Sequence, residues 1–169
     1  MDTVAAVVLA AGEASRFGSP KQHLLLPTVL ERLRRTRVDE VVVVEGAHAL
    51  DIPHDDTTRV VHCSDWERGP GASLRCGLAA LGDDVDAAVV VLADGPDLAP
   101  EAVERVLASW IESGGVVAAS YDGARGHPLL LGRADWEEIP DRGLRGRAVR
   151  LVPCDDLGSP GDVDRPEDL

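Results

Sequence analysis

Aromatic residues are scarce in this sequence of 169 residues: Phe, Trp and Tyr make up only 3% of it, although 44% of the residues are hydrophobic. The core must therefore be built from Ala, Val and Leu. A long hydrophobic run is also missing. Residues 4–11 are apolar, but they are too few to span a bilayer, and no basic segment precedes them as in a signal peptide. We therefore expect no membrane segment and interpret residues 4–11 as a buried strand.

Cysteine is rare as well, with three residues that are odd in number, far apart in the chain and without a C-x-x-C pair: Cys63, Cys76 and Cys154. This pattern predicts neither a disulfide framework nor a zinc site. It favours a reducing, cytoplasmic setting.

Basic residues are outnumbered, with 17 Lys and Arg against 30 Asp and Glu and a formal net charge of −13. Nucleic-acid backbones are held by basic stripes, and the sequence has none, so a general DNA- or RNA-binding surface is excluded. The acidic surplus is typical of a solvated exterior. A phosphate group must therefore meet a local basic site.

The remaining pattern predicts a single α/β domain over residues 1–169. Continuous aliphatic runs of the kind found in parallel strands occur at 3–9, 40–45, 58–63, 86–93 and 115–120. Helical spacing occurs between them at 29–36, 72–81 and 100–112. Strand followed by helix, repeated, predicts an α/β sandwich with a mainly parallel twisted sheet. Glycines and Pro128 around residues 129–131 interrupt this rhythm and predict a loop and a short strand at the edge of the sheet.

A glycine-containing loop, residues 9–21, follows the first predicted strand. In open α/β sheets ligands bind at the carboxyl ends of strands, where glycines such as Gly12 let backbone N–H groups approach phosphate oxygens. Arg16 and Lys21 supply positive charge. The spacing matches neither G-x-G-x-x-G nor the P-loop pattern, and a purely structural turn is the alternative. The candidate nucleotide-binding residues here are Leu9, Ala10, Ala11, Gly12, Arg16 and Lys21.

A second glycine segment, residues 69–75, precedes a predicted helix. Free N–H groups at the start of that helix, including that of Gly71, could face an anion or a base, and Ser73 offers a hydroxyl. A simple Gly-Pro turn is the alternative reading.

Acidic residues at two places are candidate metal ligands. Asp94 ends the fourth predicted strand, and Asp162 and Asp164 form an i, i+2 pair that would point to one side of an extended segment. Mg²⁺ prefers carboxylate oxygens together with substrate phosphates. For Asp94 a strand-terminating turn is the alternative, since Asp, Gly and Pro are all turn residues.

His127 lies between Gly126 and Pro128 and is a candidate for lining an acceptor pocket, with a surface-loop histidine as the alternative. The sequence contains no G-x-S-x-G motif and no cysteine in a recognisable catalytic setting. Covalent catalysis therefore has no support.

Six ordered motifs together resemble the MobA-like NTP transferases, most closely the molybdenum cofactor cytidylyltransferases. They cover nearly the whole chain and comprise LAAG…SRFG…K from Leu9 to Lys21, the segment 69–78, LADGP at 92–96, GHP at 126–128, DRG at 141–143 and GDVDRPEDL at 161–169.

The resemblance implies a Rossmann-like nucleotidyltransferase fold, a three-layer α/β/α sandwich, and it assigns roles to several residues. Arg16 and Lys21 would hold the triphosphate, and Ser73 would contact the base. Asp94 and one late aspartate, Asp162, would bind Mg²⁺. The residues expected towards the pterin acceptor are Gly126, His127, Pro128 and Arg142.

The reaction implied is transfer of a nucleotidyl group from an NTP, with CTP favoured, to molybdopterin, with release of pyrophosphate. Guanylyl or other nucleotidyl transfer to another phosphorylated small molecule is the alternative within the enzyme class. The segment after Lys21 is shorter than in the family, which favours a second alternative, a member that binds a nucleotide without turnover. The family context also implies a molybdoenzyme or chaperone partner. An NAD-type domain is disfavoured because G-x-G-x-x-G is missing.

Overall fold

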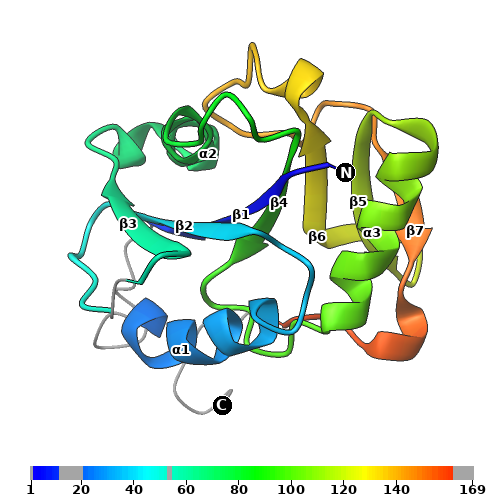
Figure 1. Cartoon of the computed structure of the whole chain (residues 1–169), viewed down its shortest axis with the longest axis horizontal. Helices are drawn as coiled ribbons and strands as arrows, with labels where there is room; N and C mark the ends of the chain where they lie inside the picture. Colours follow the sequence, from blue (N-terminus) through cyan, green and yellow to red (C-terminus); the bar gives the residue numbers. More distant parts are fainter. Residues whose placement is uncertain (1, 12–20, 53–54, 162–169) are drawn as a thin grey trace.

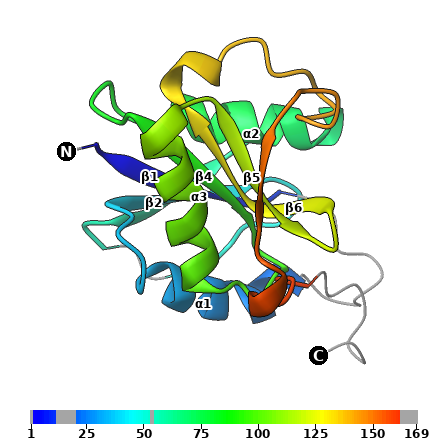
Figure 2. The same ribbon diagram turned by 90° about the vertical axis from the view of Figure 1, so that its right-hand side faces the viewer.

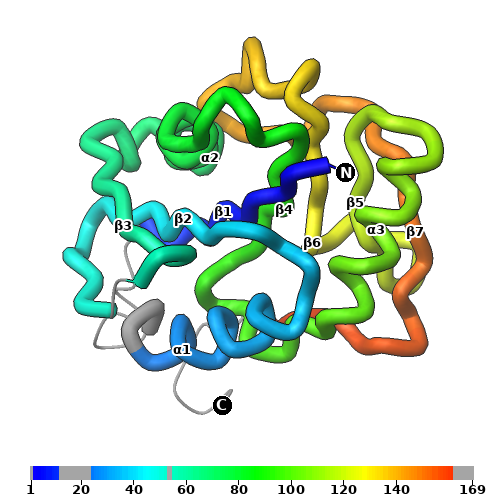
Figure 3. The backbone as a smooth tube through the Cα atoms, viewed as in Figure 1, coloured from blue at the N-terminus to red at the C-terminus, as the bar shows by residue number. Residues whose placement is uncertain are grey.

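The computed structural model describes residues 2–11, 21–52 and 55–161, which form a seven-stranded sheet and its covering helices (Figure 1). The strand order is β3-β2-β1-β4-β6-β5-β7, so that β3 and β7 are the two edges (Figure 3). The strands are β1 (Val4–Ala10), β2 (Glu40–Glu45), β3 (Thr58–His62), β4 (Ala87–Leu92), β5 (Val116–Tyr121), β6 (Ala124–Gly132) and β7 (Arg150–Pro153). The helices are α1 (Lys21–Leu33), α2 (Pro70–Ala79) and α3 (Pro100–Ser113), with short 3-10 turns at Trp66–Arg68, Arg133–Asp135 and Asp155–Leu157.

Helices cover both faces of the sheet (Figure 2). One core contains the apolar sides of α1 and α3, for example Leu26 and Val106, packed on Val8 of β1. The other core places Leu78 of α2 against Val7, the neighbour of Val8 that points to the opposite face. This confirms the Rossmann-like three-layer α/β/α fold. In the described part of the chain, none of the helices is both long enough and apolar enough to cross a membrane.

The centre of the sheet is parallel, as the continuous aliphatic runs predict. β1 pairs in parallel with β2 on one side and β4 on the other, with Val7 opposite both Val42 and Val90. All three side chains are at most 3% exposed. The carboxyl ends of β1, β2 and β4 therefore meet at one edge, where a ligand can reach several loops at once.

The prediction of a loop and short edge strand around residues 129–131 is wrong. Residues 124–132 form β6, a nine-residue strand that lies inside the sheet, antiparallel to both β4 and β5. A tight hairpin at Asp122 and Gly123, both with positive φ, joins β5 to β6. Asp-Gly is a strong signal for such a turn. Leu129 to Leu131 are buried because helices or loops cover both faces of this strand.

The first helix begins eight residues earlier than its predicted start at Val29, and it contains Pro27. A proline inside a helix removes one backbone hydrogen bond and usually ends the helix. Here the buried side chains of Leu26, Val29, Leu30 and Leu33 recur at helical spacing and pack on the sheet. Their burial outweighs the cost of the proline.

Candidate active site

A cavity of about 420 Å³ opens at the carboxyl edge of the sheet, on the face covered by α2. Its walls come from the ends of β1 and β4, the start of α2, the start of β6 and the segment 142–145. The lining residues are Leu9, Pro70, Leu74, Val90, Leu92, Arg125, Gly126, His127, Leu129, Arg142, Gly143, Leu144 and Arg145. Chain segments that are far apart in sequence thus meet at one site.

The glycine-containing loop enters this site from β1. Leu9 lines the cavity, while Ala10 and Ala11 are buried, and the carbonyl of Ala11 accepts a hydrogen bond of 3.1 Å from the N–H of Ala47. Gly12 and Arg16 lie outside the described residues. Lys21 is the first residue of α1, and its side chain is likewise outside the description. The predicted triphosphate clamp stays a prediction.

The start of α2 is docked against the segment that follows β6. The N–H of Gly71 donates to the carbonyl of Asp141 at 2.8 Å, and a Cβ on Gly71 would lie 1.7 Å from the carbonyl oxygen of Pro140. The prediction that this N–H is free to face an anion is therefore wrong, because the backbone of Asp141 occupies it. A glycine is needed at position 71 because the backbone of Pro140 lies too close for a side chain. Ser73 is 4% exposed and does not line the cavity, so its contact with a base stays a prediction.

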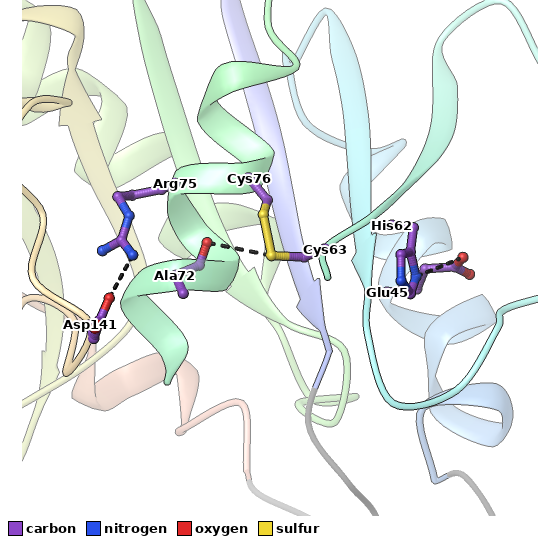
Figure 4. Close-up of a disulfide and its surroundings, with 7 residues drawn as sticks. All are labelled: Glu45, His62, Cys63, Ala72, Arg75, Cys76 and Asp141. Atoms are coloured by element: carbon purple, nitrogen blue, oxygen red, sulfur yellow. Dashed lines mark hydrogen bonds and ion pairs between the residues drawn. A yellow bond between two sulfur atoms is a disulfide. The ribbon is translucent and has the colours of Figure 1, made fainter. Parts of the chain in front are cut away.

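Two arginines, Arg75 and Arg68, hold the side chain of Asp141, and Figure 4 shows the bond from Arg75. Arg75 donates to Oδ1 at 2.5 Å and also to the carbonyl of Ile139 at 2.6 Å, and Arg68 lies 3.2 Å from Oδ2. The hydrogen bond from Arg75 holds the pKa of Asp141 below its ordinary value. This carboxylate therefore links the wall of the cavity to Arg75 of α2 and to Arg68.

The same helix carries a disulfide that the cysteine pattern did not predict. Cys63, directly after β3, is bonded to Cys76 in α2, with their Cα atoms 5.8 Å apart (Figure 4). The expectation that no disulfide is present is wrong because pairing depends on how the fold places residues 13 positions apart. Cys154 is a buried free thiol. The cytoplasmic setting had relied on unpaired cysteines and now stays a prediction without that support.

Asp94 follows β4 at the same edge of the sheet, partly buried. The chain returns to its loop near the last described residues: the N–H of Asp97 donates to the carbonyl of Pro160 at 3.0 Å, and the Cβ position of Gly95 lies 3.3 Å from the carbonyl oxygen of Gly161. The predicted ligands Asp162 and Asp164 lie outside the described residues. Among those that are described, no cluster of three His, Cys, Asp or Glu side chains could hold a metal.

His127 lines the cavity on β6, where burial lowers the pKa of its imidazole, and the charge of Asp94 opposes that shift. The hydroxyl of Tyr121 donates to the carbonyl of His127 at 2.8 Å. A side chain at Gly126 would meet the ring of Tyr121 at 2.9 Å, so the glycine lets this ring pack against the strand. The predicted residues Gly126 and His127 therefore share one wall with Arg142, and Pro128 is buried next to them.

Sequence reasoning missed three arginines at this site. Arg75 orients Asp141, Arg125 donates to the carbonyls of Leu144 and Arg147, and Arg145 lines the cavity. The sequence signal that could have revealed Arg145 is Gly143, a turn residue between it and the predicted Arg142, and the structure gives this glycine a positive φ.

The family pattern described as MobA-like NTP transferase domain matches residues 6–152. The chain belongs to this family. The match covers β1, the start of α2, β4, β6 and the segment 142–145, so all described walls of the cavity are part of the MobA-like domain. A comparison with curated protein sequences found no significant match.

Solved structures agree with the family assignment. Rv0371c from Mycobacterium tuberculosis H37Rv is 30% identical, with a TM-score of 0.83 over 98% of this chain and 95% of that chain. A second structure, of Rv0371c in complex with manganese, shows 26% identity and a TM-score of 0.69 over 89% and 88% of the two chains. The 4-diphosphocytidyl-2C-methyl-D-erythritol synthase of Anaerococcus prevotii DSM 20548, at 17% identity, shares the fold with a TM-score of 0.73 over 99% and 92%. Membership of the MobA-like family supports nucleotidyl transfer as the activity.

Proposed function

We propose that this chain transfers a nucleotidyl group from an NTP to a phosphorylated acceptor and releases pyrophosphate, with CTP as the favoured donor and molybdopterin as the favoured acceptor. One observation carries the proposal: the loop of Asp94, the start of β6 with His127, and Gly161 converge at the carboxyl edge of the sheet, beside the end of β1. Ligands of open α/β sheets bind at this edge. Family membership supports the reaction class.

We infer that a divalent cation such as Mg²⁺ binds at this edge, because Mg²⁺ prefers carboxylate oxygens together with substrate phosphates. Asp94 would supply one carboxylate. The second expected ligand, Asp162, lies outside the described residues and follows Gly161, whose carbonyl oxygen lies 3.3 Å from the Cβ position of Gly95. Manganese in the Rv0371c complex is consistent with a divalent ion in this fold. A bound ion would neutralise charge on the triphosphate and on the leaving pyrophosphate. The protein would contribute mainly positioning and positive charge, from Arg16 and Lys21.

The acceptor side is assigned to the cavity. Gly126, His127 and Pro128 come from β6, and Arg142 comes from the facing segment. The low pKa of His127 keeps the imidazole neutral near pH 7, so that it can accept or donate a hydrogen bond without adding charge. Guanylyl or other nucleotidyl transfer to another phosphorylated small molecule is the alternative, because the described residues do not identify the base.

The test offers the purified full chain CTP, GTP, ATP or UTP with Mg²⁺ and a panel of phosphorylated acceptors that includes molybdopterin, and follows pyrophosphate release. We expect release with CTP and molybdopterin. Asp94→Asn should lower kcat about 10²- to 10³-fold, by analogy with the loss of one electrostatic group at a reacting centre. Asp83→Asn is the matched control, since Asp83 is exposed after α2.

No release with any pair of substrates would refute the enzymatic proposal. In that case, CTP binding by calorimetry separates the remaining readings. Binding that is lost in Arg16→Ala would identify a member of the family that binds a nucleotide without turnover.

A further inference from the structure

The segment 139–147, which forms one wall of the cavity, is held in place at its start by α2. Arg75 donates to the carbonyl of Ile139 and to the side chain of Asp141, at 2.6 and 2.5 Å. The carbonyl of Asp141 accepts a bond of 2.8 Å from the N–H of Gly71. These contacts join the wall to a helix that the disulfide also ties to β3.

The other end of the segment is held by β6. The guanidinium of Arg125 donates to the carbonyl of Leu144 and, at 3.0 Å, to that of Arg147. Arg147 in turn donates to the carbonyl of Asp135 at 2.8 Å. Arg75 and Arg125 thus bind backbone carbonyls of this segment, and Arg147 at its end binds the backbone of Asp135 outside it.

Two further arginines of the segment, Arg142 and Arg145, line the cavity and are exposed to it. Neither forms a hydrogen bond or an ion pair with another of the described residues. Gly143, with φ +87°, makes the turn between them, and its N–H donates to the carbonyl of Pro140 at 2.9 Å. The turn therefore presents two guanidinium groups on a fixed backbone.

Like charges on a fixed backbone repel each other, and an anion between them relieves that repulsion. Guanidinium groups bind carboxylate and phosphate through paired N–H donors. The rest of the lining is largely apolar, with Leu9, Leu74 and Leu92 among its residues. The cavity therefore suits a ligand with an apolar or flat middle and an anionic end.

We propose that Arg142 and Arg145 form an anion site for the acceptor, which therefore carries a second anionic group in addition to the phosphate that reacts. Asp94 is not among the residues that line the cavity, whereas both arginines are. An anion on the arginines thus lies in a different part of the site from a phosphate at the metal. This inference rests on the proposed function in its broader form, transfer to a phosphorylated small molecule, and narrows that acceptor to compounds with a second anionic group.

The test compares two probes that differ in one anionic group: glycerol 3-phosphate, and 3-phosphoglycerate with its added carboxylate. Each is titrated by calorimetry into the full chain, with and without Mg²⁺ and a non-hydrolysable CTP analogue. The variants are Arg142→Gln and Arg145→Gln. Arg34→Gln is the matched control, because Arg34 is an exposed arginine at the end of α1, on the other face of the sheet.

We expect 3-phosphoglycerate to bind the unmodified chain about 10- to 100-fold more tightly than glycerol 3-phosphate, as one charge-assisted contact implies. Arg142→Gln and Arg145→Gln should each remove most of this preference, while Arg34→Gln keeps it. The affinity for the CTP analogue should change less than about twofold in all three variants. Thermal midpoints equal to that of the parent chain would show that the variants are folded.

Two results would overturn the inference. One is equal affinity for both probes in the parent chain. The other is a loss of affinity for the CTP analogue in Arg142→Gln or Arg145→Gln that matches the loss for 3-phosphoglycerate, which would assign the arginines to the nucleotide. If the CTP analogue fails to bind the parent chain, the proposed function fails instead, and the titrations without nucleotide still decide the role of the arginines.

Discussion

Breaking the bond between Cys63 and Cys76 is expected to lower the free energy of unfolding by about 3 kcal/mol. The two residues are 13 positions apart, so the bond closes a short loop that contains the start of α2. A loop of this size removes about 10 cal/mol/K of chain entropy from the unfolded state, or about 3 kcal/mol at 25 °C. For a chain of 169 residues this corresponds to a fall of about 8 °C in the thermal midpoint.

The assay is urea denaturation of the parent chain, with and without a phosphine reductant, and of a variant that carries both Cys63→Ala and Cys76→Ala. Reductant should lower the stability of the parent chain by the stated amount. It should leave the double variant unchanged, because Cys154 has no partner among the described residues. A thiol count in denaturant without reductant should give one free thiol for the parent chain.

Three free thiols in that count would show that the bond is not formed. A shift of the unfolding curve below about 1 kcal/mol on reduction would instead show that the unfolded chain gains little freedom, against the entropic argument.

The remaining predictions concern the walls of the cavity. Gly71→Ala should destabilise the chain by at least about 2 kcal/mol in urea denaturation, because the added Cβ would lie 1.7 Å from the carbonyl oxygen of Pro140. Asp141→Asn should speed hydrogen exchange at the amide of Gly71, since the ion pairs that hold the segment, above all that with Arg75, are lost. The imidazole of His127 should titrate by NMR with a pKa below its ordinary 6.5, because burial disfavours its charged form.

Each of these has a contrary outcome. A helix glycine replaced by alanine normally gains stability, so a stabilised Gly71→Ala would show that the contact with Pro140 is not made. In the parent chain the lowered pKa of Asp141 means that its carboxylate stabilises the folded state. This stabilisation is complete above pH 3.8, the ordinary pKa, and is lost as the pH falls through the lower pKa of the folded chain. An unchanged rate of hydrogen exchange at the Gly71 amide in Asp141→Asn would show that the ion pairs of Asp141 do not hold the segment against α2.

The pKa of His127 is lowered by burial, whereas that of Asp141 is lowered by the hydrogen bond from Arg75, but both shifts make the folded chain less stable in acid. Below about pH 6.5 the unfolded chain takes up a proton that the folded chain resists, so stability falls as the pH falls through this window. His127→Gln should remove this part of the pH dependence. A measured pKa at or above 6.5 would refute the reasoning.

The centre of the fold could be predicted from the sequence because its strands are buried on both faces and read as continuous aliphatic runs. The alternation of strands and helices also predicted a parallel sheet, and with it the glycine-containing loop at the carboxyl end of β1. The position of β6 was not predicted because the glycines and the proline at its start were given more weight than the apolar run that follows. The Asp122–Gly123 pair is the sequence signal that indicates the hairpin. Pro27 misled in the same way, because local propensity was given more weight than the burial of neighbouring leucines.

The site was harder to predict, because its contacts join segments that are distant in sequence. Nothing local to Gly71 indicates that the backbone of Asp141 takes its N–H, and nothing local to Cys63 indicates Cys76 as its partner. Both depend on how α2 docks. Arg75 and Arg125 read as ordinary surface charges until the carbonyls that they hold are known.

The position of β6 has a consequence for the growing chain. β4 pairs with β1 on one side, but its other neighbour is synthesised only after α3 and β5. Until residues 124–132 emerge, β4 presents an open row of N–H and C=O groups along the apolar run Ala87 to Val90, an edge that can pair with another chain. A nascent chain halted before Ala124 is therefore expected to aggregate, because the edge of β4 stays open until the β5–β6 hairpin pairs with it.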